Sequence, residues 1–220
     1  MAKIAKPNFT KRKAYYMKTI YFLSVVLFFN SICWSQDQGE FDFGIFGGIS
    51  LSNVSTAEDQ QAATTRLGFN AGVYGDYYFS ESWSGKIAVS YNQNGWDDGL
   101  FIGQSGLRRI ETFSLHYVTI AVSPNWHFGG KNKNWYLNLG PYVSVLAGAN
   151  AGTTQIRDAF NSTDIGLTGG LGYKFSLARK SNTFLFVEFA GQSGLTDIFK
   201  ENSGDAVRNG RSSLNVGVIF

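Results

Sequence analysis

Few residues of this 220-residue chain have the types and spacing that catalysis needs. Ser114 and His116 lie two positions apart with Glu111 close by, and a serine, a histidine and an acid are the components of a hydrolytic triad. A triad also needs a group that orients the base and a defined oxyanion site, and this spacing indicates neither. We therefore predict no catalytic activity and keep hydrolysis as an alternative.

A second candidate is a pair of opposite charges. Asp76 and Lys86 are each five residues from Glu81, the centre of a tight turn, so a hairpin would place them nearly opposite each other. One interpretation is a gated or ion-selective interior, and the other is a structural ion-pair network. We favour the network, because charges removed from water need partners. Three further charged residues are expected on the same face: Asp42, Lys174 and Glu188.

Eight predicted strands would position these residues, because apolar and polar residues alternate along them. The last strand shows the pattern most clearly. Leu214, Val216 and Phe220 fall on one face, while Ser213 and Asn215 fall on the other. The strands are expected at residues 41–52, 67–79, 83–94, 111 or 112 to 128, 135–147, 165–175, 183–191 and 211–220.

The connections between these strands alternate between long and short. An even strand number with such connections is typical of outer-membrane barrels, whose short turns face the periplasm. In a closed antiparallel barrel the terminal strand pairs with the first strand and leaves no free edge. Pro124 in the fourth strand predicts a bulge or a fraying end there, since proline cannot donate to the ladder. Long loops are expected at residues 54–65, 95–110, 150–164 and 195–210.

Composition and the placement of aromatic residues favour a membrane barrel over a soluble one. Charged residues make up 16% of the chain and aromatic residues another 16%, a composition that excludes disorder. The polar strand faces are rich in Gly, Ser and Asn, which fit a narrow interior, and the aromatic residues gather near strand ends, as in an interfacial girdle. We therefore predict an all-β fold, an eight-stranded antiparallel up-and-down transmembrane β-barrel in the bacterial outer membrane.

The N-terminal segment has the features of an export signal. Basic residues precede a charge-free apolar run at residues 19–32, which is too short to span a membrane and suits a signal-peptide core. We predict a cleaved signal peptide over residues 1–35, with Met17 as an alternative translation start, and a barrel domain over residues 36–220. The only cysteine, Cys33, lies in the predicted signal peptide, so the mature chain can form no disulfide. The net charge of +3 also arises from this segment and gives no support for nucleic-acid binding.

Charged residues in the long loops have two interpretations. Asp97, Asp98 and Asp205 could bind Ca²⁺, although they lack the regular spacing of a calcium loop. Arg108 and Arg109 could contact the phosphates of lipopolysaccharide. Solvated loop charge explains both sets, and no motif for a metal or a phosphate-bearing cofactor is present, so we predict no cofactor.

Two residues near the predicted short-turn end have structural interpretations. His127 is expected to be an interfacial side chain. Phe220 ends the chain on the apolar face of the last strand, and it resembles the C-terminal signal that outer-membrane barrels present to their assembly machinery. We predict that Phe220 acts as such a signal.

Six short segments carry a family resemblance: Phe43–Asn53, His116–Ile120, Leu139–Val143, Asp164–Leu167, Gly170–Tyr173 and Gly194–Ile198. In their order along the chain they resemble motifs of the PorT-like outer-membrane β-barrels of Bacteroidota-type bacteria, over about residues 41–220. The chain departs from the family's Tyr-Leu-Glu-Ile-Pro segment, because Thr119 replaces the acid and Ala121 the proline. The resemblance implies an eight-stranded outer-membrane barrel, and the family's name-giving member is linked to protein secretion.

We predict an integral outer-membrane protein without enzymatic activity, with a structural or interaction role through its outer loops. Three alternatives stay open: an accessory component of protein secretion, a lipid-modifying barrel enzyme that uses Ser114 and His116, and a small pore. The expected partners are outer-membrane lipids and lipopolysaccharide, the barrel-assembly machinery and, for the secretion alternative, secretion-system proteins. Nucleic acid is not an expected partner.

Overall fold

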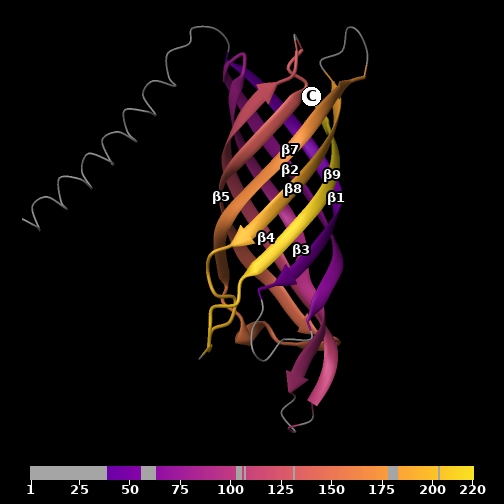
Figure 1. Cartoon of the computed structure of the whole chain (residues 1–220), viewed down its shortest axis with the longest axis vertical. Coiled ribbons are helices and arrows are strands. Elements are labelled where there is room, and N and C mark those ends of the chain that lie inside the picture. Colours follow the sequence, from indigo (N-terminus) through magenta and orange to yellow (C-terminus); the bar gives the residue numbers. More distant parts are fainter. Residues whose placement is uncertain are drawn as a thin grey trace, which may run out of the picture. The chain divides into compact units, whose positions relative to one another are not determined.

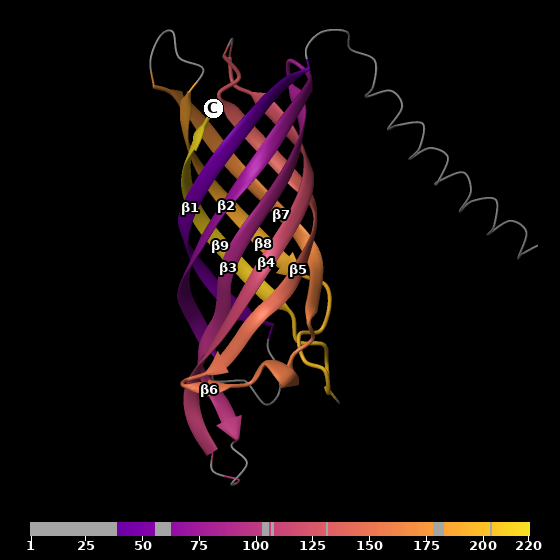
Figure 2. The same cartoon turned by 180° about the vertical axis from the view of Figure 1, so that it is seen from behind.

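Antiparallel strands form a closed ring in this computed structural model (Figures 1 and 2). The structure describes residues 39–55, 63–102, 106, 108–130, 132–177, 183–202 and 204–220. The predicted signal peptide, including Met17 and Cys33, lies outside the described residues. Among those described, no helix is long and apolar enough to cross a bilayer. The ring strands are β1 (Glu40–Val54), β2 (Thr64–Ser80), β3 (Trp83–Ile102), β4 (Arg108–Phe128), β5 (Trp135–Ala151), β7 (Thr163–Ser176), β8 (Phe184–Gly194) and β9 (Asn209–Ile219).

Pairing between β1 and β9 closes the ring, as the sequence pattern predicts. The register runs from Gly44 opposite Ile219 to Val54 opposite Asn209. Phe220 extends the pairing by one residue, since its N–H donates to the carbonyl oxygen of Phe43 at 2.8 Å. The other strands pair with their neighbours in chain order, and β5 pairs with β7 directly. The predicted fold, an eight-stranded antiparallel up-and-down barrel, is confirmed for the described residues.

The apolar faces of the strands point outward, and the polar faces point into the interior of the barrel, here called the lumen. On β9, Leu214 is 48% exposed and Val216 is 58% exposed, whereas Ser213 and Asn215 are buried. This arrangement is the reverse of a soluble barrel and matches a lipid-facing surface. The prediction about which face points outward is therefore confirmed.

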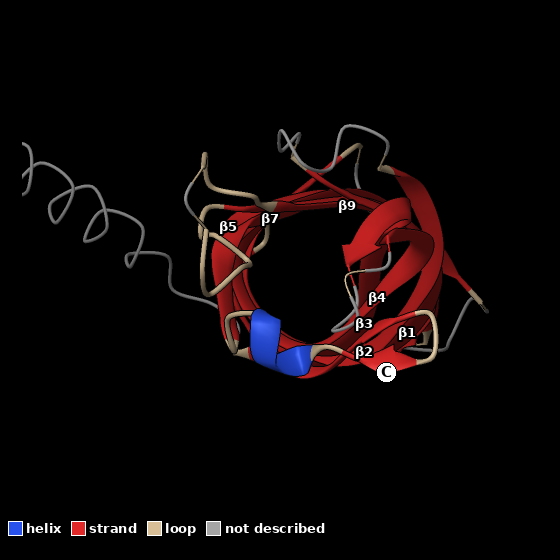
Figure 3. Ribbon diagram, turned by 90° about the horizontal axis from the view of Figure 1, so that it is seen from below, coloured by secondary structure: helices blue, strands red, loops and turns tan. Residues whose placement is uncertain are grey.

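The two ends of the barrel differ in their connections. One end carries the short connections and Phe220, and we call it the turn end. Its three connections are Ser80–Trp83, residues 128–135 and residues 176–184. The opposite end, the loop end, carries the short strand β6 (Thr154–Gln155) and the 3₁₀ helix η2 (Arg157–Ala159). Figure 3 views the ring from the loop end and shows η2 at its rim.

The prediction of a long loop at residues 95–110 is wrong for most of that range. Strand β3 continues to Ile102 and β4 begins at Arg108, so the two form an extended hairpin. The segment Trp96–Gly99, Trp-Asp-Asp-Gly, has the composition of a loop, but the structure accommodates it as a β-bulge between Trp96 and Gly99. Asp98 takes the left-handed conformation there, with φ at 57°, and the ladder resumes beyond it. Similarly, β6 and η2 occupy part of the loop expected at residues 150–164.

The prediction of a bulge or a fraying strand end at Pro124 is also wrong. Pro124 lies opposite Gly85 within an unbroken β3–β4 ladder. On the other side, β4 and β5 keep one register past it, with Ala121 opposite Tyr142 and Asn125 opposite Asn138. The proline costs a donor but does not displace the strand, because the flanking pairs on both sides hold the register.

Candidate functional site in the lumen and at the loop end

The predicted charge pair lies in the lumen near the turn end. Asp76 of β2 is directly opposite Lys86 of β3, and both side chains are buried. Their contacts run to other partners. Nζ of Lys86 lies 3.0 Å from Oε2 of Glu188, whereas Oδ2 of Asp76 accepts a hydrogen bond from Asn125 at 2.9 Å. The structure thus gives Lys86 a different carboxylate partner from the one expected, because side chains from across a narrow lumen reach it as readily as its strand neighbour does.

Glu188 is the centre of this network. Besides Lys86, it accepts hydrogen bonds from Asn138 at 3.2 Å and from Asn215 at 3.4 Å, so residues of β3, β5 and β9 meet at one β8 side chain. The ammonium of Lys86 also lies 4.5 Å from the centre of the Tyr74 ring, a cation–π contact. With Lys86 and Glu188 paired and aromatic rings packed around the ammonium, this part of the lumen has the character of a structural core.

A second ion pair lies on the same interior face. Nζ of Lys174 is 3.8 Å from Oδ2 of Asp42, and it donates a hydrogen bond to the hydroxyl of Tyr78. Asp42, Lys174 and Glu188 therefore share the lumen with Asp76 and Lys86. The expected common face for these five charged residues is confirmed.

A serine–histidine contact that the sequence did not indicate lies beside this network. Oγ of Ser84 is 2.7 Å from Nε2 of His127, and Oδ2 of Asp76 lies 4.0 Å from that same nitrogen. In a triad the acid orients the base through its other ring nitrogen, so this arrangement is not one. Both side chains are also closed to solvent, His127 at 3% exposed. The expectation that His127 is an interfacial residue is wrong, because its place in the alternation directs it into the lumen.

Hydrogen bonds from an arginine and from neutral side chains cross the lumen nearer its middle. Arg211 of β9 donates to Oδ1 of Asn92, whose Nδ2 donates to Oγ1 of Thr119 at 2.7 Å. Thr119 in turn lies 2.7 Å from Oγ of Ser144. This chain of contacts connects β9 with β3, β4 and β5 at one height of the barrel.

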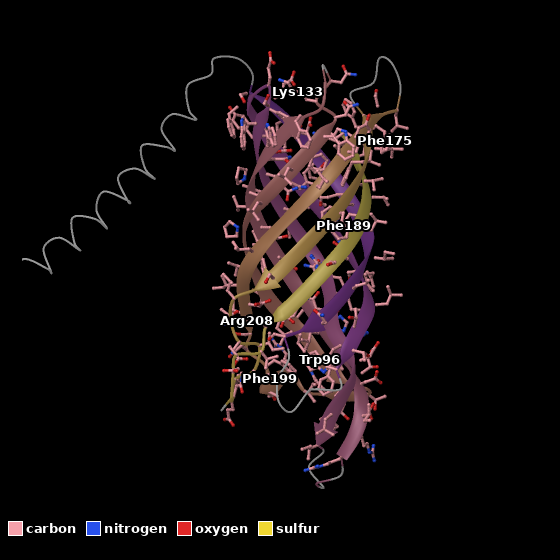
Figure 4. All side chains as sticks on the ribbon, viewed as in Figure 1. Trp96, Lys133, Phe175, Phe189, Phe199 and Arg208 are labelled. Carbon is pink, nitrogen blue, oxygen red and sulfur yellow. The ribbon has the colours of Figure 1, made fainter. Side chains whose placement is uncertain are left out.

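The lumen changes character at the loop end, where an apolar cluster fills it. Leu115, Leu146 and Trp96 are completely buried there, and Trp96 stacks on Phe113 with ring centres 4.6 Å apart. Figure 4 places Trp96 and Phe199 together at this end. The other buried members of this loop-end cluster are Tyr117, Ala149, Ala151, Phe160, Ile198 and Val207.

Two connections cover the loop-end cluster as a folded cap. Asn161 donates through its Nδ2 to the carbonyl oxygens of Asp197 and Phe199, both at 2.9 Å. Phe160 forms a β-bridge with Phe199, and the two rings stack with their centres 4.9 Å apart. Below the cap, Asp164 accepts hydrogen bonds from side chains that include Tyr142 and Thr196. These loop segments are therefore part of the packed structure.

The predicted triad candidates do not come together. Ser114 and His116 both lie on the outward side of β4, flanking the buried Leu115. Nδ1 of His116 is 2.6 Å from the hydroxyl of Tyr91, and the two rings stack. Glu111 instead lies against the backbone of Gly152, where an added Cβ would be 2.4 Å from its carboxylate. The side chain positioned to orient His116 is thus a tyrosine, and a tyrosine hydroxyl does not replace the acid of a triad.

The acidic loop residues are used in local contacts. Oδ2 of Asp98 accepts a hydrogen bond from Thr64 at 2.8 Å, and Asp97 lies 3.9 Å from Nε of Arg66. Asp205 contributes its carbonyl oxygen to Asn202. In the described part of the chain, no group of three or more His, Cys, Asp or Glu side chains could hold a metal ion.

The β3–β4 hairpin is the most prominent element of the loop end. Its last shared pairs with the ring are Thr64–Asp97 on one side and Phe113–Ala151 on the other. From Gly99–Glu111 to Ile102–Arg108 its two strands pair with each other, and Figures 1 and 2 show it extending past the other strands. The hairpin thus presents side chains away from the ring.

The family assignment follows from the comparison with known families. A family model described as "Outer membrane protein beta-barrel domain" matches residues 34–200. The chain belongs to this family. It is a β-barrel protein of the bacterial outer membrane, as the outward apolar face of the barrel also indicates.

Solved structures of outer-membrane proteins are similar to this chain over most of its length. Neisserial surface protein A is 18% identical with a TM-score of 0.50, covering 84% of this chain and 100% of that one. OprG of Pseudomonas aeruginosa is 15% identical with a TM-score of 0.48, covering 84% of this chain and 97% of that one. Ail of Yersinia pestis, in complex with the heparin analogue sucrose octasulfate, is 15% identical with a TM-score of 0.43, covering 82% of this chain and 99% of that one. No curated protein sequence matches this chain.

Proposed function

We propose that this outer-membrane barrel is a non-catalytic interaction protein whose contact element is the β3–β4 hairpin. Because the short turns of such barrels face the periplasm, the loop end would face the cell exterior. The observation that carries the proposal is the exposure of two large aliphatic side chains on the projecting hairpin: Ile102 is 56% exposed and Ile110 is 69% exposed. Exposed apolar side chains that lie together beyond the ring mark a contact surface.

The outward face of the hairpin combines apolar and basic groups. Ile102 lies opposite Arg108 and Leu100 opposite Ile110, so Ile102, Ile110 and Arg108 share one face. Arg109 is exposed on the same strand. Aliphatic groups beside guanidinium groups fit a partner protein with an apolar surface and neighbouring carboxylates. The arginines alone would fit lipopolysaccharide phosphates.

Site-specific photo-crosslinking in intact cells tests this proposal. A photoreactive residue in place of Ile110 should yield one discrete protein product, and the I102S substitution should reduce its yield several-fold. A photoreactive residue in place of Leu195, which is 57% exposed at the loop end outside the hairpin, is the matched control. Crosslinks from Ile110 to lipopolysaccharide alone, or an identical product pattern from both positions, would overturn the proposal of a protein partner.

The absence of catalysis is part of the proposal, and the lumen supports it. Ser84 contacts His127, but the nearest acid, Asp76, lies on the same ring nitrogen, and the partner of His116 is the hydroxyl of Tyr91. Glu188 and its partners fill one part of the lumen, and the loop-end cluster fills another. A filled interior also argues against the small-pore alternative.

A role as an accessory of protein secretion is a second candidate. The ordered PorT-like motifs favour it, among them Leu139–Val143 in β5 and Gly194–Ile198 after β8. The measurement is the secreted protein profile of a deletion strain. Loss of secreted proteins that the full-length chain restores would support this role, whereas an unchanged profile would remove it.

We also propose that Phe220 is recognised by the barrel-assembly machinery. Phe220 is 57% exposed on the lipid-facing side, and its backbone completes the β1–β9 seam at Phe43. Deletion of Phe220 should reduce the amount of heat-modifiable barrel in the outer membrane several-fold, measured by gel mobility of membrane fractions. The F220Y variant, which keeps an aromatic end, is the control. Normal insertion of the deletion variant would contradict this role.

A further inference from the structure

An apolar groove of about 540 Å³ runs across the outward face of the barrel on β1, β8 and β9, with Phe175 of β7 at one end. Its centre is the β9 segment Val216–Val218, which pairs with Ile45–Gly47 of β1 and with Leu185–Val187 of β8. The groove lies on the seam that closes the ring. The remaining lining residues are Phe46, Phe186 and Gly217.

One outward glycine makes the surface hollow at this place, and one inward glycine lets a ring pack beneath it. Gly47 is an outward position, and a Cβ added there would meet nothing closer than the carbonyl oxygen of Asn70 at 3.8 Å. Gly217 points inward, where an added Cβ would be 2.5 Å from the Phe186 ring. The Phe186 ring therefore packs under the strand, and backbone forms the floor of the groove.

The walls of the groove select an apolar ligand. Outward side chains of Ile45, Leu185, Val187 and Val216 surround the floor, and every lining residue is apolar or glycine. The backbone groups of the floor are already used in the β1–β9 and β8–β9 ladders. No ion or hydrogen-bonding group would find a partner here, whereas a hydrocarbon chain would gain dispersion contacts on three sides.

The position of the groove identifies the occupant. It faces the hydrocarbon of the membrane, and Phe175 lies toward the turn end, as Figure 4 shows. We infer that the groove binds one acyl chain of a phospholipid in the periplasmic leaflet. The volume falls within the range of about 300–1,000 Å³ of small-ligand sites. A second protein would instead need about 800 Å² of buried surface on each partner, more than this short groove offers.

Lipid titration followed by native mass spectrometry tests the inference, with dipalmitoyl phosphatidylethanolamine as the probe. The wild-type barrel should retain one lipid at low lipid concentration, and G47L, which fills the groove, should bind it at least about 10-fold more weakly. The matched control is G191L, because Gly191 is an outward glycine with nothing within 4 Å of an added Cβ. Equal lipid retention by wild type and G47L would overturn the inference, as would a barrel dimer that G47L abolishes.

A second measurement on the wild-type barrel does not depend on the folding of a variant. A nitroxide on the acyl chain of the same lipid should broaden the methyl signals of Val216 and Val218 at lipid ratios that leave Val89 and Val122 unaffected. The latter two valines are lipid-exposed on β3 and β4, away from the groove. Uniform broadening of all four valines would show general solvation by lipid and would overturn a specific site.

Discussion

The two halves of the lumen are packed by different chemistry. Near the turn end, Lys86 and Glu188 form a buried ion pair, and Lys174 pairs with Asp42. Near the loop end, the cluster around Leu146 contains no charge, and the cap segments close over it. Both halves solve the same problem, since the interior of an eight-stranded barrel must be filled by its own side chains.

The two halves of the lumen differ in how specific the side-chain partners of their buried residues must be. A buried charge needs a specific partner, so Glu188 ties together strands that are far apart in the sequence. An apolar cluster needs only matching volume, so it can accept side chains such as Phe160 and Ile198 from loop segments. The charged half is consistent with a fixed core, and the apolar half lets connections fold into the barrel.

The largest expected effect is at Glu188. The E188L variant leaves the Lys86 ammonium buried without its carboxylate, which should lower the free energy of unfolding by about 3–5 kcal/mol. Urea unfolding in lipid vesicles measures this loss. The double variant K86M/E188L should recover most of it, because an apolar pair can replace a buried ion pair. If E188L alone were as stable as wild type, the turn-end half would not depend on paired charge.

The matching change in the apolar half is L146A. Leu146 is fully buried in the loop-end cluster, and its truncation leaves a cavity that should cost about 2–5 kcal/mol. The damage should be local, so hydrogen exchange should accelerate at η2 and at Ile198 while β-strand amides around Glu188 keep their protection. Equal acceleration of hydrogen exchange at both ends would show that the two halves unfold as one unit, and would contradict the distinction between them.

The smallest effect is expected outside the lumen, at the exposed pair that joins two turns. Nζ of Lys133 donates a hydrogen bond to Glu81 at 2.8 Å, and this contact lowers the pKa of the Glu81 carboxyl below its ordinary value. A carboxyl with a lowered folded-state pKa stabilises the fold above its unfolded-state pKa, and that contribution is lost as pH falls through the folded-state pKa.

The K133M variant should therefore raise the pKa of Glu81 toward its ordinary value with little change in stability at neutral pH, since the pair is solvent-exposed. Carboxyl carbon chemical shifts of Glu81 across the acidic pH range measure the shift. Lys174, which is largely buried and pairs with the partly exposed Asp42, offers the contrast, because K174M should destabilise the barrel far more than K133M. Comparable losses from both variants would contradict this ranking of exposed and buried pairs.

The strands and the closure of the barrel could be predicted from the sequence, because the alternation of apolar and polar residues is a local property of each strand. In Arg211–Phe220, a period of two separates Leu214 and Val216 from Ser213 and Asn215, and this pattern fixes which side chains share a face. The extension of β3 to Ile102 could not be predicted in this way. Its ladder continues past the bulge at Asp98, and stacking of Trp96 on Phe113 holds the two strands together there.

The sequence by itself thus determined the barrel, its outward apolar face and the set of charged residues that share the lumen. Only the tertiary structure decided that Lys86 pairs with Glu188, that His127 contacts Ser84, and that no acid joins Ser114 and His116. The physical reason is the closure of the ring. Alternation along one strand sets the direction of a side chain, but its partner across the lumen depends on the register of every strand between them.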